Sequence, residues 1–197
     1  MSSAHVLAAL AQRLNRDAGA PAIPALYFFT DPARTPDPVA VAQRLPRGAA
    51  VVFRHFGAAD RARTAERLAR VRRARALYLF IAADAELAAR AGADGVHWPE
   101  HLAPRRVDGV RWMTVAAHSA AAVARAESSG ADACFLSPVF ETQSAGSGPA
   151  LGLFRASQIA RSARLPVIAL GGVNARSGSR LAGRGFAGIA AVDALRA

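Results

Sequence analysis

The chain has 197 residues and a formal net charge of +11, and 52% of its residues are hydrophobic. All 25 of its basic residues are arginine, which excludes mechanisms that need a lysine, such as a Schiff base or a P-loop lysine. Any phosphate group must therefore be recognised by backbone N–H groups, arginine or a metal ion. The arginine excess accompanies an alanine excess, so codon bias is the simpler explanation of the charge.

Length and composition also bound the domain organisation and the compartment. A chain of this length usually forms one domain, and we expect residues 1–197 to be a single domain. The lone Cys134 cannot form an internal disulfide, which suits a reducing cytoplasm. No segment approaches the roughly 18–20 uninterrupted apolar residues of a membrane span. We therefore predict a cytoplasmic protein without membrane association.

Short apolar runs alternate with helical patterns along the whole chain. The first predicted element is an amphipathic helix within Met1–Asp17, where apolar residues recur at helical spacing. The runs that follow are nearly continuous in hydrophobic residues, as expected of parallel strands buried on both faces. The predicted strands are Ala25–Thr30, Ala50–Arg54, Ala76–Ile81, Gly95–Trp98, Trp112–Ala116, Ala133–Ser137, Pro166–Leu170 and Gly188–Ala191. The predicted helices between them are Pro38–Leu45, Asp60–Arg73, Asp84–Ala91, Ser119–Ser129, Phe154–Arg164 and Asn174–Ala182.

Eight strands in βα alternation predict a compact (β/α)8 TIM barrel with an extra N-terminal helix and short loops. The loops must be short because this fold usually takes about 250 residues. Pro99–Gly109 and the end of the chain predict two reduced helices, and we expect the N-terminal helix to cover a barrel end. An open doubly wound sheet is the alternative, but the chain lacks a GxGxxG turn.

In such a barrel the active site lies at the C-terminal ends of the strands. The strongest local signal is the run PVIALGGV at Pro166–Val173, where a strand ends in Gly171 and Gly172 before a helix. These glycines let backbone N–H groups approach an anion near a helix start. The alternative is a tight turn that needs positive φ.

Three more side chains end predicted strands. Arg54 suits a bidentate contact to an anion, and the alternative is a rim residue in solvent. His97 and His118 end neighbouring strands and can donate to phosphate or move protons, whereas the alternative for each is a structural histidine. The carboxylates are few and none has metal-ligand spacing, so the residues alone predict no metal site.

Two further segments carry functional hypotheses. The long polar loop Ser137–Gly152 predicts a mobile lid. Arg61–Arg75 carries seven arginines, which raises the possibility of nucleic-acid binding. Since this segment holds no aromatic residue for base stacking, a solvated outer helix is the favoured interpretation.

Six short motifs follow one another along the chain: LYFFTD at Leu26–Asp31, ADGVHWPE at Ala93–Glu100, AHS at Ala117–Ser119, SPVFET at Ser137–Thr142, ALG at Ala150–Gly152, and PVIALGGV at Pro166–Val173. In this order and spacing, they resemble the thiamine phosphate synthase and TenI family of barrels.

The resemblance implies a (β/α)8 barrel of thiamine biosynthesis. Synthases of the family join hydroxymethylpyrimidine diphosphate to a thiazole phosphate with Mg2+, which makes them transferases, and the TenI branch isomerises a thiazole phosphate carboxylate. By position, Arg54, His97 and His118 match family residues, Gly171–Gly172 match its phosphate-binding glycines, and Thr142 lies in the loop that binds pyrophosphate.

This chain departs from the family at the diphosphate end. Val52 and Phe56 stand where the synthases carry glutamine and lysine on either side of the arginine, and Ala82–Ala83 replace the Asn-Asp metal pair. Ala145 lies near the place of a loop lysine, and Asp193 replaces the serine of the phosphate site. The TenI histidine is replaced by Pro138. Because pyrophosphate departure needs cations, these changes argue against synthase activity of normal efficiency.

Our leading hypothesis is therefore a diverged member of this family that binds a small phosphorylated heterocycle. We assign His118, His97 and Arg54 to catalysis, and Gly171, Gly172, Thr142, Ser137 and Asp193 to substrate and phosphate binding. One alternative is a non-catalytic ligand-binding or regulatory barrel, whose mouth we expect Phe56, Trp98 or Phe140 to fill. The other is an arginine-rich nucleic-acid-binding protein.

Overall fold

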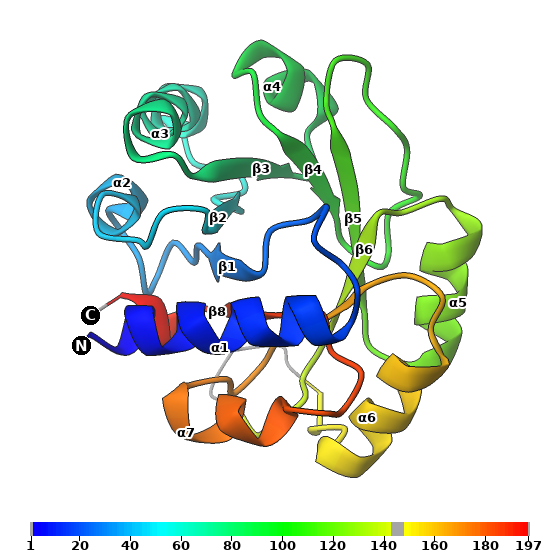
Figure 1. Cartoon of the computed structure of the whole chain (residues 1–197). Helices are drawn as coiled ribbons and strands as arrows, with labels where there is room; N and C mark the ends of the chain where they lie inside the picture. The colour runs from blue at the N-terminus through cyan, green and yellow to red at the C-terminus, as the bar shows by residue number, and fades with distance from the viewer. Residues whose placement is uncertain (1, 143–147, 197) are drawn as a thin grey trace.

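Eight parallel strands form a closed barrel in the computed structural model, which describes residues 2–142 and 148–196 (Figure 1). Each strand pairs with the next along the chain, and β8 pairs with β1. The (β/α)8 prediction is therefore confirmed, and the open-sheet alternative is wrong. The strands are β1 (Leu26–Phe29), β2 (Ala50–Phe53), β3 (Tyr78–Ala82), β4 (Gly95–Trp98), β5 (Trp112–Ala117), β6 (Ala133–Leu136), β7 (Val167–Ala169) and β8 (Gly188–Ala191).

The helices surround this barrel, and most begin at a polar cap. The side chains of Asp84, Ser119 and Asn174 accept hydrogen bonds from the first turns of the helices that follow them. As predicted, no helix connects β4 to β5, and in the described residues up to 196 the segment after β8 forms a 3₁₀ turn, η2 (Asp193–Leu195). The helices are α1 (Ser3–Asp17), α2 (Pro38–Ala42), α3 (Arg61–Arg75), α4 (Ala85–Arg90), α5 (Ala120–Ser128), α6 (Leu153–Ser162) and α7 (Ala175–Gly178), the last continued by the 3₁₀ turn η1 (Ser179–Leu181).

The N-terminal helix α1 lies beside the barrel wall rather than across a barrel end. It packs against β8, β1, α7 and η2, with Leu7 and Leu14 buried (Figure 1). It therefore occupies the place that a helix after β8 takes in a regular (β/α)8 barrel, and the expectation that it covers an end is wrong. That end is closed instead by the connection after α1, whose Ala20 and Ile23 are buried against the barrel interior. Amphipathicity predicts which face of α1 is buried but not its partner.

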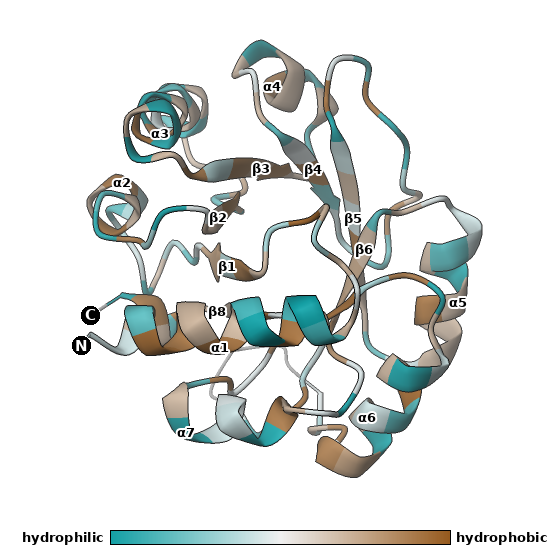
Figure 2. Ribbon diagram, in the orientation of Figure 1, coloured by the Kyte–Doolittle hydropathy of each residue, from teal (hydrophilic) through white to brown (hydrophobic). Residues whose placement is uncertain are grey.

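Hydrophobic residues form one layer inside the barrel and a larger layer between the strands and the helices. The inner layer contains Tyr27, Phe80 and Phe135, whose rings meet edge to face. Figure 2 shows brown tones along β1, β2 and β3, while α1 and α3 alternate teal and brown. Cys134 is buried in the outer layer, and this burial raises the pKa of its thiol to about 12, so it is a core thiol.

Candidate active site at the C-terminal mouth

A cavity of about 620 Å³ opens at the C-terminal ends of the strands. Its floor is apolar, formed by Phe29 and Leu170. Its wall is built by the segments that follow β1, β2, β5, β6, β7 and β8. Among the predicted site residues, those that line it are Arg54, His118, Ser137, Thr142, Gly171, Gly172 and Asp193. The topology of the barrel therefore brings together side chains that are up to 139 residues apart.

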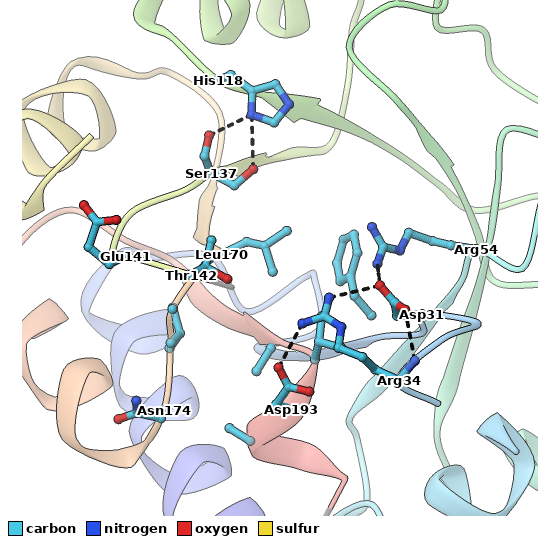
Figure 3. A pocket seen from close by; sticks show the side chains of 17 residues that line it. Asp31, Arg34, Arg54, His118, Ser137, Glu141, Thr142, Leu170, Asn174 and Asp193 are labelled. Carbon is cyan, nitrogen blue, oxygen red and sulfur yellow. Dashed lines mark hydrogen bonds and ion pairs between the residues drawn. The ribbon is translucent and has the colours of Figure 1, made fainter. Parts of the chain in front are cut away.

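One side of the cavity is a chain of ion pairs after β1, β2 and β8 (Figure 3). The Arg34 guanidinium lies between two carboxylates, 3.0 Å from Asp31 and 2.9 Å from Asp193. Asp193 also pairs with Arg196 at 3.1 Å. Burial would raise the pKa of Asp31, but the hydrogen bonds and positive charge of Arg34, with the charge of Arg54, hold it below its ordinary value.

Arg54 is held firmly at the end of β2. Its Nε donates to the carbonyl of Thr30 at 2.8 Å, and its guanidinium lies 5.5 Å from the ring centroid of Phe29. A terminal nitrogen lies 3.6 Å from the Asp31 carboxylate. Burial lowers the pKa of Arg54, although an arginine stays charged at neutral pH. The side chain is thus a fixed cation on the cavity wall rather than a rim residue in solvent.

His118 lies on the opposite side, after β5 (Figure 3). Its Nδ1 is 2.7 Å from the carbonyl oxygen of Ser137, which can only accept a hydrogen bond. Nδ1 must therefore carry the proton, so Nε2 of the neutral ring is left as an acceptor. The backbone N–H of His118 donates to Glu100, which also pairs with Arg125. The imidazole is thereby oriented, as expected of a group that accepts a proton or a hydrogen bond.

Gly171 and Gly172 form a tight turn between β7 and α7, with φ values of 87° and 65°. A Cβ on Gly171 would lie 2.6 Å from Cα of Pro138, and one on Gly172 would lie 2.3 Å from the carbonyl oxygen of Glu141. The turn alternative is therefore confirmed, while the anion site stays a prediction. Neither N–H donates a hydrogen bond to another described residue. Asn174 already caps the first turn of α7, so the helix start itself offers little to an anion.

The loop after β6 is anchored on both sides of its undescribed part. Val139 donates to the carbonyl of Leu170, Phe140 donates to Gly171, and Leu151 donates to Pro138. This pairing fixes Ser137 and Thr142 at the cavity wall. The predicted lid spans Ser137–Gly152, and its residues 143–147, which include Ala145, lie outside the described residues. Closure of the lid stays a prediction.

His97 does not line the cavity, so its assignment to catalysis is corrected. Its ring lies inside the barrel, 5.2 Å from the ring centroids of both Phe29 and Phe135, and it is 3% exposed. Nδ1 lies 3.2 Å from the hydroxyl oxygen of Thr114. Burial, together with the charge of Arg54, lowers the pKa of His97 to about 3. The residue is a neutral core histidine beneath the cavity floor, which is the structural alternative.

The end of β3 does not fit the Mg2+ that the resemblance implies. Ala82 and Ala83 offer no carboxylate, and the Asp84 carboxylate caps α4 while pairing with Arg61. Arg61 also donates to the carbonyl of Ala82 at 2.7 Å, so a guanidinium already occupies this position. The described residues include no group of three or more histidine, cysteine, aspartate or glutamate side chains that could hold a metal ion.

The aromatic residues expected to fill the mouth of a non-catalytic barrel lie elsewhere. Phe56 is exposed and lies under the Arg61 guanidinium, and Trp98 is buried outside the barrel, where its indole donates to Arg105. Phe140 packs on the outer hydrophobic layer. None of them lines the cavity, so the expected occlusion is wrong. Val52, which stands where the synthases carry glutamine, packs in the barrel interior.

Sequence reasoning missed Arg34, the central cation of the ion-pair chain. It lies in the irregular connection between β1 and α2, where no periodicity indicates direction. The available signal was Asp31 at the end of β1, because its carboxylate accepts from the backbone N–H groups of Ala33 and Arg34. That turn brings the Arg34 side chain back toward Asp31.

The arginines of α3 divide into two groups. Arg72 pairs with Asp94 and Arg61 with Asp84, which ties the helix to the barrel. The remaining five are exposed, as a solvated outer helix requires: Arg63, Arg67, Arg70, Arg73 and Arg75. In the described part of the chain, no helix is long and apolar enough to span a membrane.

Comparisons with known proteins agree with this geometry. The thiamine monophosphate synthase family model matches residues 26–195, which is most of the chain. The chain belongs to the thiamine monophosphate synthase family. A thiamine-phosphate synthase of Alcanivorax borkumensis is 31% identical over 182 residues, covering 86% of this chain and 84% of that protein. One from Bacillus velezensis is 29% identical over 184 residues, covering 86% and 82%.

Solved structures show the same fold as this family member. A thiamine phosphate pyrophosphorylase from Pyrococcus furiosus superposes with a TM-score of 0.77 at 23% identity, covering 95% of this chain and 90% of that one. FabK from Thermotoga maritima superposes with a TM-score of 0.65 at 14% identity, covering 88% and 58%. At these identities the likeness speaks for the barrel fold alone.

Proposed function

We propose that this family member binds a thiazole phosphate or thiamine phosphate at the mouth of its barrel and has lost synthase activity of normal efficiency. The observation that carries the proposal is the cavity itself, which gathers every predicted site residue except His97. Its volume of about 620 Å³ lies within the range of roughly 300–1,000 Å³ of small-molecule sites. Its strand-end position is where such barrels bind their ligands.

The walls suit the two ends of such a ligand. The backbone N–H groups of Gly171 and Gly172 can receive phosphate oxygens at a place that only glycine can occupy. The Thr142 hydroxyl lies on the same wall. The heterocycle then rests on Phe29 and Leu170, with Nε2 of His118 as a hydrogen-bond acceptor or proton acceptor.

The loss of synthase activity rests on the β2 and β3 ends. Releasing pyrophosphate requires cations near its oxygens. Here the positions of the family's lysine and metal pair are Phe56, Ala82 and Ala83, and the nearby carboxylate of Asp84 is already paired with Arg61. We further place the protein in the cytoplasm, as its single, buried cysteine suggests.

Calorimetric binding and a coupling assay test the proposal. We expect saturable binding of thiamine phosphate or thiazole phosphate, and no robust turnover of the two synthase substrates with Mg2+. Arg54→Gln should weaken binding at least tenfold, whereas the exposed control Arg67→Gln on α3 should not change it. No affinity for either phosphate refutes the binding proposal, and rapid turnover refutes the proposed loss of activity.

A further inference from the structure

Arg61 binds the end of β3 and the residue that caps the next helix. Two of its nitrogens bind protein oxygens: one donates to the Ala82 carbonyl at 2.7 Å, the other to Asp84 at 2.5 Å. Its guanidinium lies 5.9 Å from the ring centroid of Phe53 and 5.7 Å from that of Phe56. Its third nitrogen, Nε, has no accessible surface. Two nitrogens of the side chain are thus bound to protein oxygens, Nε has no hydrogen-bond partner among the described residues, and Arg61 does not line the cavity.

The backbone at Ala83 has a conformation that suits the asparagine or aspartate of the family's Asn-Asp pair. Ala83 has a φ of 55°, in the left-handed region where asparagine and aspartate are several-fold enriched and alanine is strained. The Asp84 carboxylate has both oxygens engaged, one by Arg61 and the other by the N–H of Leu87. A divalent cation would have to displace Arg61 and would then find one carboxylate.

The cavity stops short of this region. The part of the chain that the structure describes contributes no lining residue from β3, β4 or the segments that follow them. A ligand at the Gly171–Gly172 turn therefore meets the ends of the other six strands, while Arg61 and Asp84 pair with each other outside the cavity lining. The space suits one phosphorylated end of a ligand, and the second phosphate-binding end is closed.

Charge on the cavity wall leads to the same conclusion. The described lining residues include three carboxylates, those of Asp31, Glu141 and Asp193, and two guanidinium groups, those of Arg34 and Arg54. Both aspartates already pair with Arg34. A diphosphate would bring more negative charge to these carboxylates than a single phosphate, which the N–H and O–H donors can hold beside the Arg54 guanidinium.

We infer that the mouth selects ligands with a single phosphate monoester and binds them without a divalent cation, with Arg61 closing the β3 end. This inference rests on the proposed function, because it names the ligand class of the same site. A diphosphate site needs a cation that can bind the ligand. At the end of β3 the protein instead carries the Arg61 guanidinium, whose charge is already neutralised by Asp84.

Calorimetry on the full-length protein tests the inference with thiazole phosphate, thiamine phosphate and inorganic pyrophosphate, each in 5 mM MgCl2 and in EDTA. We expect the affinity for the bound monophosphate to agree within twofold between the two buffers, and pyrophosphate to bind no more tightly with Mg2+ than without it. A tenfold or larger gain with Mg2+, for the monophosphate or for pyrophosphate, overturns the inference and leaves the proposed function intact. No binding of either monophosphate refutes both.

The substitution Arg61→Gln tests whether Arg61 closes the β3 end of the mouth or contacts the ligand. With the fold confirmed by circular dichroism, its affinity for the monophosphate in EDTA should stay within threefold of the unmodified protein. A tenfold loss would show that Arg61 contacts the ligand, which overturns its assigned role. The control Arg67→Gln, on the exposed face of the same helix, reports any effect of charge alone. The Mg2+ comparison on the unmodified protein stands even if Arg61→Gln does not fold.

Discussion

His97 makes the stability of this barrel depend on pH in a defined window. Its ring is fully buried with a folded-state pKa of about 3, whereas in the unfolded chain it returns to its ordinary value of 6.5. Between these values the unfolded state binds the proton and the folded state does not, so stability falls as the pH falls. The loss begins below pH 6.5 and levels off near pH 3.

The size of the effect follows from this window. Each pH unit below 6.5 costs about 1.4 kcal/mol, so acidification from pH 6.5 to 4.5 costs about 2–3 kcal/mol through His97. The substitution His97→Leu removes this pH-dependent contribution to the free energy of unfolding, independently of any stability that the variant loses at pH 7. Urea unfolding followed by tryptophan fluorescence at pH 7.0, 5.5 and 4.5 should therefore give a flatter stability curve for the variant than for the unmodified protein.

The exposed His101 provides the matched control, because His101→Gln should keep the slope of the unmodified protein. His97→Gln should be as flat as His97→Leu, since neither side chain titrates. Equal slopes for the unmodified protein and both His97 variants would refute the reasoning, because they would mean that His97 takes up its proton in the folded state.

Three other tests, which use four substitutions, concern the cavity wall and the barrel wall. Asp193→Asn releases Arg34 from an ion pair and should tighten thiamine phosphate binding about 3- to 10-fold by calorimetry; weaker binding contradicts this. Gly172→Ala and Gly183→Ala impose the same left-handed strain, of about 1–2 kcal/mol, but only Gly172 has an atom within 4 Å of the new Cβ. Gly172→Ala should melt several degrees lower than Gly183→Ala, and equal melting would argue against a packing role. Leu7→Ala should cost about 2–5 kcal/mol in urea unfolding if α1 is part of the barrel wall, and a loss under 1 kcal/mol contradicts that placement.

The barrel could be predicted because its strands are buried on both faces. Continuous apolar runs with glycines at the helix ends specify parallel strands, and closure follows from their number and order. The place of α1 could not be predicted in the same way. Its apolar stripe requires a partner, but the partner is β8, at the other end of the chain.

The sequence predicted site residues that lie at the ends of strands. It failed where the position of a side chain depends on its depth in the barrel or on the geometry of a loop. Strand alternation directs His97 inward and Trp98 outward, but it does not tell how far below the rim a side chain lies. His97 and His118 are thus equivalent in the sequence and opposite in the structure, one buried and one exposed. Arg34 depends on an irregular turn, whose side-chain direction no periodic pattern specifies.

The position of α1 has a consequence for how the polypeptide could be rearranged. Because α1 packs on β8 and beside η2, the helix that completes the wall is encoded before β1 rather than after β8 (Figure 1). The barrel is therefore a cyclically shifted version of the usual strand-then-helix order. A circular permutant that carries α1 behind η2, joined by a short glycine-rich linker, would place every helix after its strand without altering a contact in the cavity.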